Sequence, residues 1–479
     1  MSNTNTMNPS MNPKAAYTIG LLFAIPLVLS GCVSKLAPLP AADVPVGWEA
    51  PVNAQAPMWP KRDWWNNFED PELTTLISSV QTSNLDLANV KRNLDSAQIS
   101  LREAGYNLLP TPVVTIGTGA ITSEVRNSPL LGDKSTGTNQ PLTLNAGFTY
   151  NDILSKPAIY DKALADYSGR VAQAGSLALT TLGTAASTYF QLLLIRDKVV
   201  AARQNLSNAE AIGAIAQARF DAGVAVQIES LQQQIAIENA RNSLRSLQQN
   251  DLSARAALAL LQGRNVQRFN INSKSMLDIK VPSVQPGIPS DLLRRRPDLV
   301  LAEATLKSSN ANLTIVHNSL FPQISLTAAG SVSSTALSTL VASPTSSLTI
   351  SASLLETLLD NGQRFRNIDQ ARITLENNLT SYRKSVLAAF NDVEVQLSNI
   401  QLLESQNLTA FNNLHAAEES FREAQARYGE GVTDYQTMLQ SQNTLFTARN
   451  SWLDSKLLQL NAAVGLYQAL GGGWEAPAR

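Results

Sequence analysis

The side chains that most often perform chemistry in proteins are scarce in this chain. Among 479 residues there is one cysteine, Cys32, and there are two histidines, His317 and His415. One cysteine forms no internal disulfide, and two distant histidines without cysteine partners form no recognisable metal-ligand set. No nucleophile elbow or phosphate-binding loop is present, and acids such as Asp392 and Glu394 fall on predicted helix surfaces. The sequence therefore predicts neither an enzyme nor a metal or other cofactor.

Cys32 is the exception, because its surroundings predict a covalent modification. Lys14 is followed by an apolar run over 15–29, and Ser30 and Gly31 directly precede Cys32. A basic start, a short apolar core and small residues before the cut are typical of a signal peptide, and the run is short for a transmembrane helix. The layout resembles the bacterial lipobox, in which the cysteine is acylated and becomes the new N-terminus. We therefore expect Cys32 to carry lipid.

Charge and the residue after the cysteine indicate where the chain resides. The formal net charge is −1, whereas nucleic-acid binding would require a basic surface. Val33 stands where an Asp would retain a lipoprotein of enteric bacteria in the inner membrane. An outer-membrane address without a nucleic-acid partner is therefore expected. Translation could begin at Met1, Met7 or Met11.

Proline divides the rest of the chain into helical and non-helical stretches. None occurs between Pro157 and Pro282 or between Pro344 and Pro477, and both stretches are rich in helix-favouring residues. In the second stretch, apolar residues recur at coiled-coil spacings, which predicts long packed helices. They are Leu439, Phe446, Leu453, Leu460 and Tyr467 in one run, and Val386, Phe390, Val393, Leu397 and Ile400 in the other.

The two helical stretches match one another at a constant offset of 208 residues, counted from Gln217 to Gln425. The register continues without a gap to the glycines at the far ends, which we interpret as an internal duplication. The matched pairs are 217–220 with 425–428, Gly223-Val224 with Gly431-Val432, Leu231 with Leu439, 240–243 with 448–451, and Gly263 with Gly471.

Each repeat contains one tight break, at 221–223 and at 429–431. Glycine there permits the positive φ that ends a helix and reverses the chain. Each repeat is therefore predicted to be a helical hairpin, whose first helix, 158–222, would be roughly 100 Å long at about 1.5 Å per residue. A bundle broken at Gly175 or Gly213 is the alternative.

Two strand-like runs precede each hairpin, at 110–122 and 141–152 and at 321–334 and 346–356. Apolar residues alternate with small neutral polar ones, which suits a membrane barrel with lipid outside and water inside. A soluble half-buried sheet would alternate too, but more often with charges on its wet face. Four strands cannot close a barrel, whose usual minimum is about eight. The chain would therefore oligomerise, because an open edge in lipid leaves backbone groups unpaired. A dimer would have eight strands and a trimer twelve, and the strand pattern alone does not choose between them.

Three motifs resemble the outer-membrane factor (TolC-like) family, in its OprM/NodT branch of efflux lipoproteins. The run from Trp64 to Leu73 resembles WWxxFxDPxL, the run from Ser290 to Leu299 resembles SxLLxRRPDL, and Leu320 to Ile324 resembles LFPxI. With Cys32 and the duplicated hairpin, the resemblance covers nearly the whole chain after residue 31.

The resemblance implies an α+β membrane protein that forms a homotrimer. Twelve strands, four per chain, would make an outer-membrane β-barrel, continued by a long periplasmic α-helical coiled-coil barrel. Such a channel is the passive exit duct of a tripartite export system, and receives small molecules such as drugs. Its partners would be a periplasmic adaptor (membrane fusion) protein, an inner-membrane RND or ABC pump, and outer-membrane lipid. The cargo and the pump's energy source stay open.

A lipid-anchored periplasmic adaptor is the alternative function. Adaptors carry one helical hairpin within a lipoyl-like, β-rich chain, whereas two hairpins and four strands favour the channel. The predicted division is a signal peptide 1–31, an extended arm 32–62, a first repeat 63–270 with hairpin 158–263, and a second repeat 271–479 with helix 290–319 and hairpin 361–471.

The hairpin ends are the predicted functional sites, because only they can meet an adaptor from below. We expect docking at Gly223, Val224, Gly431 and Val432. A tunnel left open would leak the periplasm, so a gate is expected beside these turns, although a solvated charged turn is the simpler reading. With Gln at 436 and 440, its inner ring should be less acidic than in relatives. The gate residues are Arg219, Glu229, Arg427, Asp434, Tyr435, Gln436 and Gln440.

Overall fold

A computed structural model describes residues 45, 48–49, 60–118, 121–126, 134–139, 142–273, 275–283, 289–334, 344–357 and 359–475. Cys32, the predicted signal peptide and most of the predicted arm lie outside these residues. The elements described below all belong to one unit that spans 42–479.

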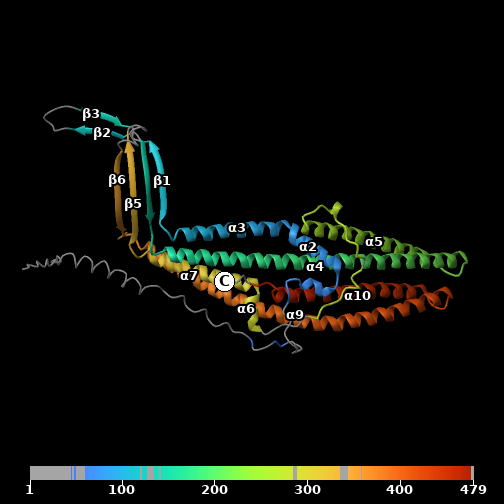
Figure 1. Ribbon diagram of the computed structural model, residues 1–479. Coiled ribbons are helices and arrows are strands. Elements are labelled where there is room, and N and C mark those ends of the chain that lie inside the picture. The colour runs from blue at the N-terminus through green and yellow to red at the C-terminus, as the bar shows by residue number, and fades with distance from the viewer. Residues whose placement is uncertain are drawn as a thin grey trace, which may run out of the picture. The chain divides into compact units, whose positions relative to one another are not determined.

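Two long helices form the spine of this unit (Figure 1). α4 (Lys156–Asp221) has 66 residues and α9 (Gln363–Gly429) has 67, so each is roughly 100 Å long at about 1.5 Å per residue. Pro157 is tolerated in α4 because it stands in the first turn. The alternative of a bundle broken at Gly175 or Gly213 is wrong, since α4 runs through both.

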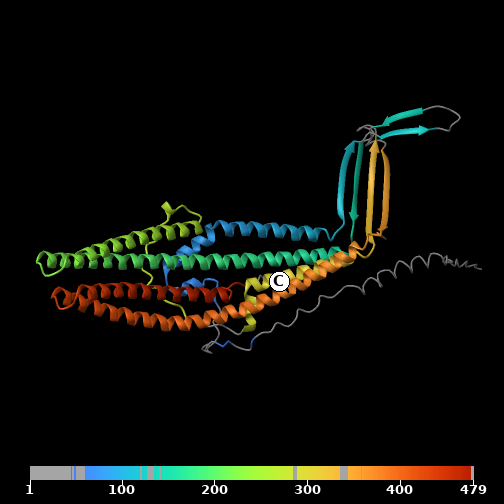
Figure 2. The same cartoon turned by 180° about the vertical axis from the view of Figure 1, so that it is seen from behind.

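A shorter helix returns along each long one. α5 (Gln227–Leu261) packs on α4, α10 (Tyr435–Ala469) packs on α9, and α10 also contacts α4. Figure 2 shows the two hairpins side by side, with both turns at the same end. One window of α4 is long and apolar enough to cross a membrane by length and composition, but 56% of it is buried inside the protein. α4 is therefore best explained as a core helix.

Shorter helices cover the other end of α4 and α9. α3 (Leu85–Tyr106) lies along α4, and α7 (Pro297–Asn318) lies between α4 and α9. The helix predicted at 290–319 is interrupted: Arg296 is extended, with φ −86° and ψ 120°. Pro297 accounts for the break, because proline disfavours a helical conformation in the residue before it. The remaining short elements are η1 (Trp64–Phe68), α2 (Pro71–Ser83), η2 (Val266–Arg268), η3 (Pro289–Asp291) and α6 (Leu292–Arg295).

An antiparallel sheet in the order β1-β4-β5-β6 connects to the helices (Figure 1). β4 pairs with β5, which joins the two halves of the chain. The run predicted as one strand at 110–122 divides, because its end belongs to a separate hairpin, β2–β3, that sequence reasoning missed. The strands are β1 (Thr111–Thr118), β2 (Ile121–Arg126), β3 (Lys134–Asn139), β4 (Leu142–Tyr150), β5 (Gln323–Ser334) and β6 (Thr345–Leu355).

The largest buried cluster lies around the middle of α4. Trp64 and Phe68 of the WWxxFxDPxL run pack there with Phe190 and Tyr467. Asp70 caps α2 by accepting the backbone N–H groups of Glu72 and Leu73, and its second oxygen accepts the Tyr189 hydroxyl at 2.7 Å. The motif therefore anchors the start of the first repeat to α4.

Candidate functional site at the hairpin ends

Both hairpins turn through the same backbone geometry. The Val224 N–H donates to the Arg219 carbonyl at 3.0 Å, and the Val432 N–H donates to the Arg427 carbonyl at 2.9 Å. The glycine before each valine has a positive φ, +70° at 223 and +75° at 431, which residues with a Cβ rarely adopt. Val224 and Val432 are 67% and 69% exposed, so each turn presents an apolar end to its surroundings.

Arg219, a predicted gate residue, reaches from the first hairpin into the second. Its Nη1 donates to the Tyr428 carbonyl at 2.7 Å, and its guanidinium lies 4.9 Å from the centroid of the Tyr428 ring. A charge-assisted hydrogen bond and a cation–π contact therefore hold α4 to the end of α9. The Arg219 Nε is buried without a hydrogen-bond partner.

Tyr428 connects the same two hairpins a second time. Its hydroxyl donates to Glu229 Oε2 at 3.0 Å, across the start of α5. Burial and the bond to the Glu229 carboxylate raise the Tyr428 pKa to about 12. Sequence reasoning did not select Tyr428. The available signal was its alignment with Phe220, since only the second repeat has a hydroxyl at that position.

Tyr435, another predicted gate residue, forms a third connection. Its hydroxyl donates to Gln233 Oε1 at 2.8 Å, and Gln233 Nε2 donates to the Ala209 carbonyl at 2.7 Å. Burial, followed by the nearby Glu229 charge, raises the Tyr435 pKa to about 12. The rings of Tyr428 and Tyr435 pack with centroids 6.0 Å apart. We call Arg219, Glu229, Gln233, Tyr428 and Tyr435 the inter-hairpin network.

The other predicted gate residues do not join this network within one chain. Arg427 pairs with Glu423 at 2.6 Å on an exposed face of α9. Asp434 caps α10 by accepting the Thr437 N–H at 2.8 Å, and this bond lowers the Asp434 pKa. Gln436 and Gln440 are exposed. The two opposite charges, Arg427 and Asp434, therefore each have a local partner.

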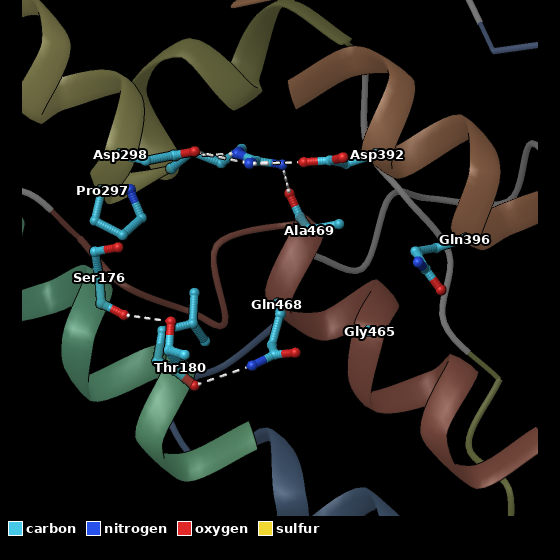
Figure 3. Close-up of a pocket in the computed structure, with 11 residues that line it drawn as sticks. Ser176, Thr180, Pro297, Asp298, Asp392, Gln396, Gly465, Gln468 and Ala469 are labelled. Carbon is cyan, nitrogen blue, oxygen red and sulfur yellow. Dashed lines mark hydrogen bonds and ion pairs between the residues drawn. The ribbon is translucent and has the colours of Figure 1, made fainter. Parts of the chain in front are cut away.

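A cavity of about 370 Å³ lies where α7 begins beside the end of α10 (Figure 3). Arg296 borders it and donates to Asp298, Asp392 and the Ala469 carbonyl. Burial opposes its charge, but these two carboxylates hold the Arg296 pKa above its usual value. A Cβ on Gly471 would lie 2.3 Å from the Arg295 carbonyl oxygen, so only glycine fits. Arg296, the arginine directly before Pro297 in the SxLLxRRPDL run, thus holds the start of α7 to α9 and to the end of α10.

Metal ligands do not gather in the described ranges: there, no three His, Cys, Asp or Glu side chains lie close enough to hold an ion. Between the helices at the hairpin ends, the described side chains form hydrogen bonds and a cation–π contact.

Comparison with known proteins identifies similar chains over nearly the full length. The profile of the family described as "Outer membrane efflux protein" matches residues 76–264 and 288–472. The pyoverdine export outer membrane protein OpmQ of Pseudomonas aeruginosa is 31% identical over 456 residues, which cover 94% of this chain and 96% of OpmQ. The toluene efflux pump outer membrane protein TtgC of Pseudomonas putida is 26% identical over 440 residues, 89% of this chain and 91% of TtgC.

The fold is also similar to that of solved outer-membrane channels. The structure of the channel OprN superposes with a TM-score of 0.80 at 21% identity, covering 92% of this chain and 99% of OprN. At that identity the similarity concerns the fold alone.

Proposed function

This chain belongs to the outer membrane efflux protein family, and from that premise we propose how it assembles, docks and closes. It resides in the outer membrane of a Gram-negative bacterium and forms the exit channel of a tripartite efflux system. We propose a passive conduit rather than an enzyme: a homotrimer whose twelve strands form the barrel and whose helical hairpins form the periplasmic tunnel.

The observation that carries oligomerisation is the sheet itself. Two copies would already supply eight strands, so the number three rests on the resemblance to the trimeric outer-membrane factors. β1 and β6 are the two edges of a four-stranded sheet, and an open edge in lipid is unfavourable because its backbone groups lack partners. Three copies would supply twelve strands, which is enough for a barrel. Ile116 on β1 and Ile350 on β6 are both exposed within one chain, which suits contact with lipid.

Channel activity of the purified protein tests this proposal. Native mass spectrometry in detergent should give three chains, and planar bilayers should show single channels that open in multiples of one unit conductance. A monomer or dimer that conducts equally well would contradict the twelve-stranded barrel.

We propose that the adaptor docks on the exposed ends at Gly223, Val224, Gly431 and Val432. Gly223→Trp should abolish export while the trimer still assembles: the positive φ strains any residue with a Cβ, but the Cβ has open space and the added ring would project toward a partner. Gly223→Ala is the matched control, since it introduces the same backbone strain at the same position without the ring. Unchanged drug resistance in Gly223→Trp would contradict docking at the turns.

We propose that the hairpin ends also form the gate. The inter-hairpin network fixes the two hairpins of one chain, and Arg427, Asp434, Gln436 and Gln440 are accessible to neighbouring chains. Arg427→Glu combined with Asp434→Ala should raise single-channel conductance, and should sensitise cells that lack the adaptor and pump to large antibiotics. If conductance and sensitivity both stay at the wild-type level, closure does not depend on these two charges.

We further propose that Cys32 is acylated, on the strength of the lipobox-like residues before it. Mass spectrometry of the mature N-terminus should find diacylglycerol on sulfur, and Cys32→Ala should block processing. A free thiol on Cys32 would contradict the anchor.

Siderophore export is a second candidate for the cargo, beside drugs. OpmQ, named for pyoverdine export, is 31% identical, whereas TtgC, named for toluene efflux, is 26% identical. Deleting the gene should then lower the iron chelator in iron-starved culture supernatants and raise it in the periplasm. Unchanged chelator levels, with loss of drug resistance, would favour drugs.

A further inference from the structure

The four-stranded sheet has two chemically different faces, and the strand register shows which residues share them. Thr115, Asn145, Ser331 and Ser347 are cross-strand partners in one continuous row. We call these four residues the hydroxyl row. Side chains alternate along a strand, so the residues two positions away lie on the same face.

The opposite face is apolar. Pro112, Phe148, Ala328 and Ile350 are cross-strand partners in a row of their own. Phe148 and Ile350 are exposed within one chain. In the proposed barrel this face meets lipid, so the face that contains the hydroxyl row lines the lumen.

The lumen-facing groups bond mainly to one another. Ser331 Oγ and Ser347 Oγ lie 2.7 Å apart, Asn145 Nδ2 donates to Thr115 Oγ1 at 3.3 Å, and Thr143 Oγ1 donates to the Gly117 carbonyl at 3.1 Å. A hydroxyl that is hydrogen-bonded to a neighbouring strand can exchange that hydrogen bond for one to a solute in the lumen. Such a surface offers donors and acceptors equally and has no preferred sign of charge.

Charged residues are distributed in keeping with this surface. Between residues 111 and 150 they are confined to 124–134, and between 323 and 355 every residue is uncharged. Rings of charged side chains are what commonly give a pore its charge selectivity. In a trimer any charge on the sheet would occur three times and form a charged ring. Because these four strands have no charge, they form no such ring.

We propose that the lumen of the barrel is a hydroxyl-lined conduit that is indifferent to the sign of the cargo's charge. It would take polar, hydrogen-bonding molecules that are cationic, anionic or neutral, and leave discrimination by charge to the hairpin ends. The inference rests on the proposed trimeric barrel, and the experiment below separates its failure from that of the barrel.

Paired thiosulfonate reagents measure the sign preference at a chosen point in the lumen. The chain has one native cysteine, and the proposed acylation leaves Cys32 without a free thiol, so Ser331→Cys in the otherwise wild-type chain gives a single reactive thiol. The wild-type trimer, which should not react, is the control. Assembled trimers are treated with trimethylammonium-ethyl or sulfonato-ethyl methanethiosulfonate, and the ratio of the two rates is normalised to that of free 2-mercaptoethanol. The expected normalised ratio is near one, because the strands around Ser331 have no charged residue. For comparison, one unit charge ~8 Å away in water would change the ratio about sixfold.

Two matched variants make the result decisive. Asn145 is the direct partner of Ser331, so adding Asn145→Asp should shift the ratio about sixfold toward the cationic reagent. Val332→Cys, one residue along on the apolar face, should react slowly with both reagents. Thr349→Cys and Ile350→Cys repeat the comparison on β6 in case the first pair fails to assemble.

The outcomes distinguish the two ideas. A strong bias toward either reagent at Ser331→Cys overturns charge indifference. An Asn145→Asp variant that leaves the ratio unchanged overturns its proposed cause, which is the absence of charged side chains from the four strands. If Val332→Cys reacts as fast as Ser331→Cys, the faces are wrongly assigned and the proposed barrel fails instead.

Discussion

The two hairpin ends share a backbone but differ in what their side chains do. Both turns have a glycine at positive φ, followed by an exposed valine, with the same capping hydrogen bond. Yet Phe220 is 37% exposed, whereas its counterpart Tyr428 is 1% exposed and hydrogen-bonded to Glu229. The arginines differ as well: Arg219 reaches the other hairpin, and Arg427 pairs with Glu423 on its own helix.

The difference shows that two repeats can have the same main-chain geometry while their equivalent side chains make different contacts. A turn depends on a few local residues, chiefly a glycine that permits a left-handed conformation. A side-chain contact depends instead on which element packs against it, and the second hairpin presents Tyr428 to α4 and α5. The first hairpin end thus leaves Phe220 partly exposed, and the second supplies the buried aromatic pair Tyr428 and Tyr435.

The largest expected effect comes from exchanging the two arginines for alanine. Arg219→Ala removes a charge-assisted hydrogen bond and a cation–π contact, which should lower local stability by about 1.5–3 kcal/mol and about 0.5–1 kcal/mol respectively. Arg427→Ala removes only an exposed pair and should change stability by less than about 0.5 kcal/mol. Hydrogen exchange at the hairpin-end amides measures both, and equal losses would show that the two ends are equivalent.

A reciprocal exchange at the matched aromatic position should have the next largest effect. Tyr428→Phe leaves the Glu229 carboxylate without its phenol donor and should cost about 1 kcal/mol, because water can reach the partly exposed carboxylate. It should also raise the conductance of purified trimers if the network helps to close the channel. Phe220→Tyr is the control and should change neither quantity. A conductance that rises in Phe220→Tyr as well would mean that any change at this level opens the channel.

Sequence reasoning predicted these local features better than the contacts between them. The glycine turns and the strand at 142–150 depend on neighbouring residues, so their patterns are readable in the sequence. The break at Arg296 could also be read from the sequence, because Pro297 follows it. The prediction of one helix over 290–319 did not use this signal. Arg219, Glu229 and Tyr435 of the inter-hairpin network are among the predicted gate residues, but their partners Tyr428 and Gln233 are not. The pairing was not readable, since it joins residues about 200 positions apart whose contact depends on how α4 packs against α9 and α10.

The N-termini of α5 and α10 provide a smaller test of the comparison, in which a substitution should stabilise the first hairpin. The N-cap residue of α10 is Asp434, whose carboxylate accepts the Thr437 N–H, whereas the N-cap residue of α5 is Val226, which provides no side-chain cap. Val226→Asp should therefore stabilise the first turn of α5 by about 0.5–1 kcal/mol. Asp434→Ala should destabilise the first turn of α10. Exchange rates of the amides after each turn measure this, and a Val226→Asp variant that exchanges faster would show that α5 needs an uncapped start.

The smallest expected effect is that of pH, and it should be larger at the second hairpin end than at the first. Tyr428 and Tyr435 both have pKa values raised to about 12 from an ordinary value of 10.0, mainly by burial. A group whose pKa is higher in the folded state stabilises the fold fully below its unfolded pKa and loses that contribution as pH rises through the folded pKa. The window is therefore pH 10 to 12, and the two phenols should contribute no pH dependence between about pH 6 and 9.

The first end has Phe220 and Gln227 at the corresponding positions, so it has nothing to titrate there. A spin label at Val432→Cys should gain mobility above about pH 10, whereas one at Val224→Cys should gain less. The Tyr428→Phe, Tyr435→Phe variant should remove that difference. A difference already present at pH 8 would show that these tyrosines do not control it, because both phenols are protonated there.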